Sequence, residues 1–192
     1  MQKNILICFS LAALAIMATA VFAGYTGSVG LTLDGTTQVS FTTASVAWGT
    51  GSVIASGTPC TLDTDATNTG CPSFNNVSTP LVIENTGTFA VKLELSSNKD
   101  AADFIGGTSP TFKWKVTNKE VGSCDDGTLP LASYTTIVKT TATTACAKFL
   151  KVPTCETAAS TLDVDLQVVI PSDATAEAKS ATITATATKW VV

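Results

Sequence analysis

The sequence of 192 residues contains no histidine and no arginine, so all 11 of its basic residues are lysines. Without histidine the chain lacks the commonest general base and the commonest metal ligand, and a serine triad with a histidine base is excluded. Without arginine it lacks the forked side chain that reads phosphates and bases, and its net charge of −4 offers no basic surface. We therefore expect no nucleic-acid partner and no enzymatic activity.

The chain is also poor in charged side chains and rich in threonine. Charged residues make up 14% of the sequence and aromatic residues 7%, whereas threonine occurs 34 times. Threonine is β-branched and favours strands, and its hydroxyl keeps an exposed strand face hydrated without adding charge. Such a composition suits a durable extracellular wall or fibre.

The first 23 residues have the pattern of a secretory signal. A single lysine, Lys3, precedes an uncharged run from Ile5 to Ala23 that ends in small residues. Two small-x-small motifs fit cleavage, at 18–20 and 21–23, and the second would leave Gly24 at the mature N-terminus. The run is also long enough to span a bilayer as an uncleaved anchor. We expect a signal peptide at 1–23, membrane contact only during export, and a single secreted, cell-surface domain at 24–192.

Period-two alternation runs through the chain after residue 24 and predicts β-strands. The clearest case is 89–96, which a turn at 85–88 joins to a strand at 81–84. The same alternation marks 111–117, 162–168 and 180–189. Further strands are expected at 29–33, 38–43, 45–48, 131–139 and 145–152, and the polar stretch 57–76 is expected to be a loop. The pattern predicts a signal helix followed by an all-β antiparallel sandwich, immunoglobulin-like or jelly-roll, of about eight or nine strands.

Five of the six cysteines follow the signal, and in an exported chain they are expected to form disulfides. Cys60 with Cys71 would close a polar loop, and Cys146 with Cys155 would close a connection between two late strands. Cys124 would then be unpaired or bonded to a neighbouring subunit. The alternative is a bond from Cys124 to Cys146 or Cys155, because sequence does not fix connectivity. The spacings do not fit a zinc site, so no metal or cofactor is expected.

Two groups of acidic residues are candidates for chemistry, and each has a simpler reading. The loop 63–70 offers oxygens for Ca²⁺ but lacks the glycine and glutamate of a calcium loop, and its residues also suit a surface turn. Asp100, Asp103, Asp125 and Asp126 could include a carboxylate pair for glycoside hydrolysis, but solvated loop carboxylates are far commoner. We expect turns and no catalytic site.

Aromatic residues and one sequon are candidates for surface recognition. Trp48, Trp114 and Trp190, with Tyr25 and Tyr134, could form a platform for sugar rings. Trp114 lies on the apolar face of its strand and is expected in the core, which leaves Trp48 and Trp190 as candidates for carbohydrate or partner contact. Asn76 begins the sequon Asn-Val-Ser, an acceptor for N-glycosylation.

The segment after the predicted cleavage site, residues 24–33 (GYTGSVGLTL), combines a short apolar alternation with flexible glycines. Val29, Leu31 and Leu33 form one apolar face. Such a segment can be the first strand of its own domain, or it can add to an open sheet edge of the next subunit as a donated strand. Donation would create a heterologous interface that does not close, and a filament follows by symmetry.

Two stretches of the chain resemble secreted fibre proteins. They are LVIENTGTFAVKL at 81–93, a strand, an Asn-x-Gly turn and an alternating strand, and VIPSDA at 169–174, which precedes a threonine-rich strand. Both are similar to the TasA/camelysin-like matrix fibres and to the bundling pili of archaea. The resemblance implies a jelly-roll or Ig-like sandwich, donated N-terminal strands and no catalysis.

These observations favour a secreted structural subunit of a cell-surface filament or surface layer. Its partners would be further copies of itself or other surface proteins. The alternative is an extracellular adhesin module that binds carbohydrate or a partner protein.

Overall fold

The computed structural model describes residues 35–53, 59–65, 68–125, 129–151 and 160–191. The predicted signal peptide and the predicted strand at 29–33 lie outside these residues. Within the described ranges, no helix is long and apolar enough to cross a membrane. The elements are β1 (Val39–Thr43), β2 (Cys60–Asp63), β3 (Leu81–Asn85), β4 (Val91–Ser97), α2 (Ala101–Phe104), β5 (Thr111–Asn118), β6 (Thr135–Thr136), β7 (Thr143–Phe149), β8 (Thr161–Ile170) and β9 (Ile183–Lys189).

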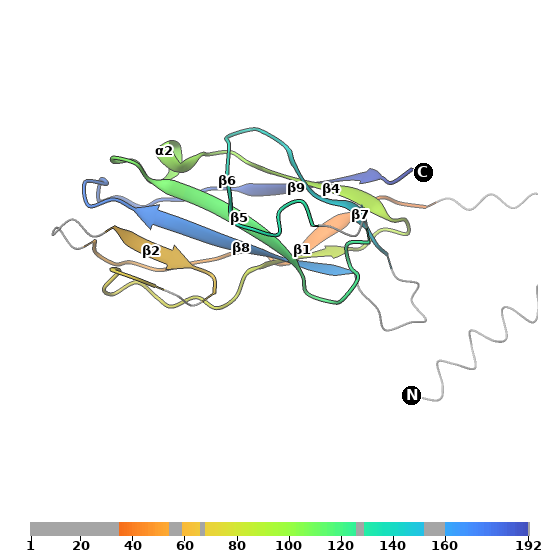
Figure 1. Cartoon of the computed structure of the whole chain (residues 1–192), viewed down its shortest axis with the longest axis horizontal. Coiled ribbons are helices and arrows are strands. Elements are labelled where there is room, and N and C mark those ends of the chain that lie inside the picture. The colour runs from red at the N-terminus through yellow and green to blue at the C-terminus, as the bar shows by residue number, and fades with distance from the viewer. Residues whose placement is uncertain (1–34, 54–58, 66–67, 126–128, 152–159, 192) are drawn as a thin grey trace, which may run out of the picture.

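Two antiparallel sheets pack face to face as a sandwich (Figure 1). Sheet A has the strand order β1-β3-β8-β5-β6, with β2 also paired to β8, and sheet B has the order β7-β4-β9. β5 pairs with β8 along nearly its full length. On the other side of β8, β3 pairs with residues 161–164 and β2 with residues 167–170, so these two short strands follow one another along one edge. The all-β sandwich predicted from the alternation is confirmed.

One hydrophobic core lies between the sheets, and the alternation of the strands explains its membership. The inward residues of β4, β5 and β8 are almost completely buried. They are Val91, Leu93, Leu95, Phe112, Trp114, Val116, Leu162, Val164, Leu166 and Val168. The outward residues of β4 and β5 are polar and partly exposed, as the pattern predicts.

The structure departs from the predicted elements in four places. β2 lies inside the stretch 57–76, which was predicted to be a loop. Only Thr135–Thr136 pair as a strand within the predicted strand 131–139, and 45–48 form no strand. The short helix α2 was not predicted, although the Asp100 side chain caps it by accepting a hydrogen bond from the Asp103 amide at 2.9 Å.

The turn between β3 and β4 is built around a buried asparagine and a glycine. The Asn85 side chain accepts a hydrogen bond from the Gly87 amide at 3.1 Å and donates to the Phe89 carbonyl at 2.9 Å. A Cβ at Gly87 would lie 2.5 Å from the Thr36 carbonyl oxygen, so a side chain there would collide with the backbone that leads into β1. Because Gly87 has no side chain, the backbone of residues 36–38, which leads into β1, can lie in close contact with the turn.

Candidate assembly edge

β9 forms one edge of sheet B. Two hydrogen bonds at its ends show which of its residues bond to β4. The Asn98 amide donates to the Thr182 carbonyl at 3.1 Å, and the Trp190 amide donates to the Ala90 carbonyl at 3.0 Å. Because bonding alternates along an antiparallel pair, the even-numbered residues of this strand bond to β4. Ile183, Ala185, Ala187 and Lys189 therefore direct their backbone N–H and C=O groups away from β4. Among the described residues, no strand pairs with that side of β9.

The side chains of β9 that point inward are only partly covered. Ile183, Ala185 and Ala187 pack against the core but keep partial exposure, whereas Leu93 and Leu95 on the adjacent strand are fully buried. Two of the three inward residues are alanines, so the apolar layer is thin along this edge. Apolar surface is left uncovered beside a row of backbone donors and acceptors.

β1 forms the neighbouring edge of sheet A and lies next to β9. The amides of Thr86 and Gly87 both donate to the Gln38 carbonyl at 3.0 Å, so the alternation directs the backbone of Val39 and Phe41 away from β3. The side chains of Val39 and Phe41 are half-buried against the core. Together Val39, Phe41, Ile183, Ala185 and Ala187 form what we call the open flank of the sandwich.

The opposite side of the sandwich is covered by connecting segments. Residues 131–137 lie along β5, where the Val116 amide donates to the Leu131 carbonyl at 2.8 Å and the Ile137 amide donates to the Phe112 carbonyl at 2.9 Å. Residues 123–125 lie along the end of β7. The two flanks therefore differ. Residues 123–125 and 131–137 line the flank formed by β5 and β7, whereas the open flank is formed by the edges of β1 and β9.

The described chain enters the sandwich at Gly35, at the end where the β3–β4 turn lies. The Thr88 amide donates to the Thr36 carbonyl at 2.8 Å, and the Thr36 amide donates to the Thr88 hydroxyl at 2.9 Å. A Cβ at Gly35 would collide with the Phe89 ring. The segment 24–34, which carries Val29, Leu31 and Leu33, is thus attached at a fixed point on this end of the molecule.

The cysteines pair differently from the expectation in one respect. Cys60 is bonded to Cys71, as predicted. Cys146 is bonded to Cys124, so the predicted Cys146–Cys155 bond is wrong. The Cα atoms of Cys124 and Cys146 are 5.7 Å apart, because residues 123–125 run beside β7, and this proximity outweighs the shorter sequence spacing. Cys155 lies outside the described residues, and none of the described cysteines is free, so the unpaired Cys124 is corrected too.

The acidic residues proposed for chemistry have structural partners. Asp100 caps α2, Asp103 pairs with Lys139 at 2.5 Å and Asp125 pairs with Lys148 at 2.5 Å. Asp126 lies outside the described residues. Among the described residues, no group of three or more His, Cys, Asp or Glu side chains is arranged to hold a metal ion.

A polar cluster on the outer face of sheet A was missed by the sequence reasoning. Asp63 is buried and accepts hydrogen bonds from the Tyr134 hydroxyl at 2.5 Å and from the Gln167 amide at 2.9 Å. Lys115 lies 3.0 Å from Asp65 and 3.5 Å from Asp165. The cluster holds the segment 129–137 against the sheet. The sequence drew attention to Asp63 and Asp65 in the loop 63–70, and to charged residues on alternating positions of β5 and β8, but it did not show that these groups meet.

Burial shapes the ionisation of this cluster. Burial raises the pKa of Asp165, the charge of Asp65 adds to that effect, and Lys115 partly offsets it. Burial and the hydrogen bond to Asp63 raise the pKa of Tyr134, so its hydroxyl stays protonated. Burial favours the neutral amine of Lys115, but the two carboxylates outweigh that effect and raise its pKa.

The described residues proposed for recognition do not come together, and Tyr25 lies outside the described ranges. Trp190 pairs with Ala90 beside the β3–β4 turn, and the Lys148 ammonium lies 4.9 Å from its ring centre. Trp48 follows the far end of β1, where it is half-buried and its carbonyl accepts from the Asn75 amide at 2.8 Å. Trp114 is in the core, as expected. Asn76 is exposed, which leaves its side chain accessible to a glycosylating enzyme.

Comparison with known proteins found no match to the chain among family models, curated proteins or solved structures. The open flank is therefore the candidate functional site on geometry alone.

Proposed function

We propose that this protein is a secreted structural subunit of a cell-surface filament or surface layer, assembled by addition of one subunit's N-terminal strand to the β9 edge of the next. The observation that carries the proposal is the outer side of β9, where the outward backbone groups have no strand partner among the described residues and lie beside half-covered apolar side chains. Backbone pairing along such an edge supplies affinity, and pockets at alternate positions supply specificity.

The predicted donor segment matches this edge in length. β9 has seven residues, which span about 23 Å at about 3.3 Å per residue. Residues 24–34, fully extended, span about 36 Å on the same scale. The segment can therefore cover the whole of β9 and still leave residues to cross between two subunits.

The predicted donor segment also matches the edge in side-chain size. Val29, Leu31 and Leu33 are large and apolar, and they repeat every second residue, as the inward positions of β9 do. Ala185 and Ala187 are small and only partly buried, so apolar surface stays exposed at these positions. Each apolar side chain that becomes fully buried on pairing contributes about 1.5–3 kcal/mol.

The compartment is consistent with this proposal. Two disulfides, Cys60–Cys71 and Cys124–Cys146, are typical of a protein that folds in an oxidising environment. The signal pattern at 1–23 directs the chain there. The resemblance of the β3–β4 hairpin to secreted fibre proteins points the same way.

A complementation experiment tests the proposal and separates donation from pairing within one chain. Leu31→Asp in the mature protein (24–192) disables the donor strand, and Ala185→Pro removes an outward N–H from the acceptor edge, where proline is tolerated. Each variant alone is expected to remain monomeric by light scattering, and their mixture is expected to form dimers, whereas the unmodified protein forms filaments by negative-stain microscopy.

The matched control is Ser28→Ala with Thr32→Ala, which alters the opposite face of the same segment and should leave filaments intact. If the strand pairs only within its own chain, the mixed variants stay monomeric. That result, or a strictly monomeric unmodified protein at all concentrations, would overturn the proposal.

A further inference from the structure

Sheet B has a second edge, β7, and a short segment of the same chain occupies its end. The Asp125 amide donates to the Lys148 carbonyl at 2.9 Å, and the Leu150 amide donates to the Ser123 carbonyl at 2.9 Å. These bonds flank the antiparallel bridge between Cys124 and Phe149. Residues 123–125, which we call the guard segment, therefore bind β7 as an added strand does.

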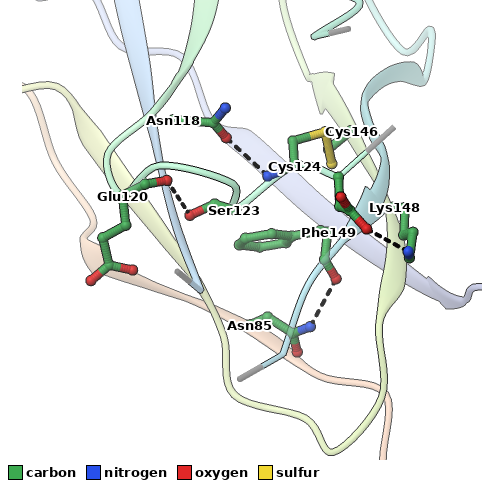
Figure 2. Close-up of a disulfide and its surroundings, with 9 residues drawn as sticks. Asn85, Asn118, Glu120, Ser123, Cys124, Cys146, Lys148 and Phe149 are labelled. Carbon is green, nitrogen blue, oxygen red and sulfur yellow. Dashed lines mark hydrogen bonds and ion pairs between the residues drawn. A yellow bond between two sulfur atoms is a disulfide. The ribbon is translucent and has the colours of Figure 1, made fainter. Parts of the chain in front are cut away.

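Four further contacts hold the guard segment in place (Figure 2). The Cys124–Cys146 disulfide ties it covalently to β7. The Lys148 ammonium pairs with the Asp125 carboxylate at 2.5 Å. The Cys124 amide donates to the Asn118 side chain at 2.9 Å, and the Ser123 hydroxyl donates to the Glu120 carbonyl at 2.9 Å.

The guard segment covers apolar surface. Phe149 and Cys146 are fully buried, and Cys124 is 7% exposed. Without the guard segment, the end of β7 would present outward backbone groups at Lys148 and Leu150 beside the Phe149 ring. That combination of bare backbone and apolar side chain is the one found along β9.

We infer that the β7 edge is a second, latent acceptor for the N-terminal strand of another copy, which the guard segment fills and the Cys124–Cys146 disulfide locks. This inference rests on the proposed function. It leaves one open acceptor in sheet B, because β9 is the edge of that sheet along whose outer side no described segment pairs. A subunit that accepts one strand and donates one strand builds an unbranched chain, whereas a second open acceptor would create branch points.

The test counts bound strands on a full mature chain that cannot donate its own. The chain carries Leu31→Asp, the probe is a synthetic peptide of residues 24–34, and native mass spectrometry reads the stoichiometry. The non-donating chain is expected to bind one peptide. The same chain with Cys124→Ser and Cys146→Ser is expected to bind two, and adding Ala185→Pro to it should leave one.

A matched control removes the other disulfide. The non-donating chain with Cys60→Ser and Cys71→Ser loses a disulfide away from β7 and is expected to bind one peptide. One peptide bound with or without the Cys124–Cys146 bond would overturn this inference and leave the proposed function standing. No peptide bound to any of the chains would overturn both.

A second measurement needs no cysteine variant, in case the reduced chain does not fold. Hydrogen exchange compares the unmodified protein in its assembled state with the monomeric Leu31→Asp chain. The amides of Asp125 and Leu150 are expected to be equally protected in both, and those of Ala185 and Ala187 only after assembly. Protection of the Leu150 amide that arises only on assembly would overturn the inference.

Discussion

The Asn85 side chain donates a hydrogen bond to the Phe149 carbonyl at 3.2 Å, joining the last residue of β3 in sheet A to the last residue of β7 in sheet B. Figure 2 shows this contact beneath the Cys124–Cys146 disulfide. Asn85 is fully buried, and its second amide hydrogen serves the Phe89 carbonyl. One side chain therefore links the two layers and the turn between β3 and β4.

Replacing Asn85 with Asp is expected to destabilise the fold strongly. The carboxylate keeps the size and the acceptor for the Gly87 amide, but it donates to neither carbonyl and adds a buried charge. Two unsatisfied buried acceptors cost about 1–3 kcal/mol each. Urea unfolding, monitored by tryptophan fluorescence, measures the loss in the free energy of unfolding.

Asn98→Asp is the matched control for this prediction. Asn98 is exposed, and its side chain accepts a hydrogen bond from the Thr182 amide at 2.8 Å, a role that a carboxylate retains. We expect a change within about 0.5 kcal/mol. Equal losses for the two variants would contradict the linking role of Asn85.

Gly87→Ala is expected to destabilise the protein by about 1–3 kcal/mol, the range for overpacked sites. The added methyl would meet the backbone at Thr36 and Gln38, and backbone atoms cannot move aside as a side chain can. Thr86→Ala changes an exposed residue of the same turn and should have little effect. Melting temperatures from circular dichroism distinguish the two variants. A Gly87→Ala protein with the melting temperature of the wild type would show that the backbone of residues 36–38 can move to accept the methyl group.

Asp165 and Asp173 are expected to give opposite pH dependences. Burial raises the pKa of Asp165, so the folded state holds that proton more tightly, and wild-type stability falls relative to Asp165→Asn as the pH rises above about 4. The hydrogen bonds from Thr108 lower the pKa of Asp173, so its contribution is present above about pH 4 and is lost on acidification. Denaturation midpoints of the wild type and both Asn variants between about pH 3 and pH 6 measure the two differences. Differences of the same sign would show that burial does not govern Asp165.

The two disulfides are expected to contribute similarly to stability. Their closed loops have sequence separations of 11 and 22, for which the loss of chain entropy in the unfolded state predicts about 2.8 and about 3.4 kcal/mol. Paired Cys→Ser variants and urea unfolding measure each value. Peptide mapping under non-reducing conditions should recover a fragment that joins Cys124 to Cys146, and a fragment that joins Cys146 to Cys155 in its place would contradict the structure.

The strands with long alternation were predictable, because one buried face fixes a period of two. β4 and β5 follow that rule residue by residue, and β8 follows it except at Asp165, which is buried on the outer face. β2 was not predictable, because its four residues become a strand only through pairing with the end of β8. The segment 131–139 was predicted as a strand, but only Thr135–Thr136 pair as one, and residues 131–137 cover β5 and place Tyr134 within hydrogen-bonding distance of Asp63.

The candidate site divides in the same way. The apolar face of Val29, Leu31 and Leu33 can be read from the sequence. The open outer side of β9 cannot be read from the sequence, because an alternation of threonine and alanine occurs both in central strands and in edge strands. The Cys124–Cys146 bond depends on a segment crossing to β7, a tertiary event that spacing does not encode.

The position of β8 has a consequence for the order of events in biogenesis. β2, β3 and β5 all pair with β8, which occupies residues 161–170, so none of these three pairings can form until most of the chain has emerged. Folding of sheet A is therefore delayed by long-range pairing until late in synthesis. A chain that begins with an N-terminal export signal would stay unfolded long enough to be translocated across a membrane, and would fold only on the far side.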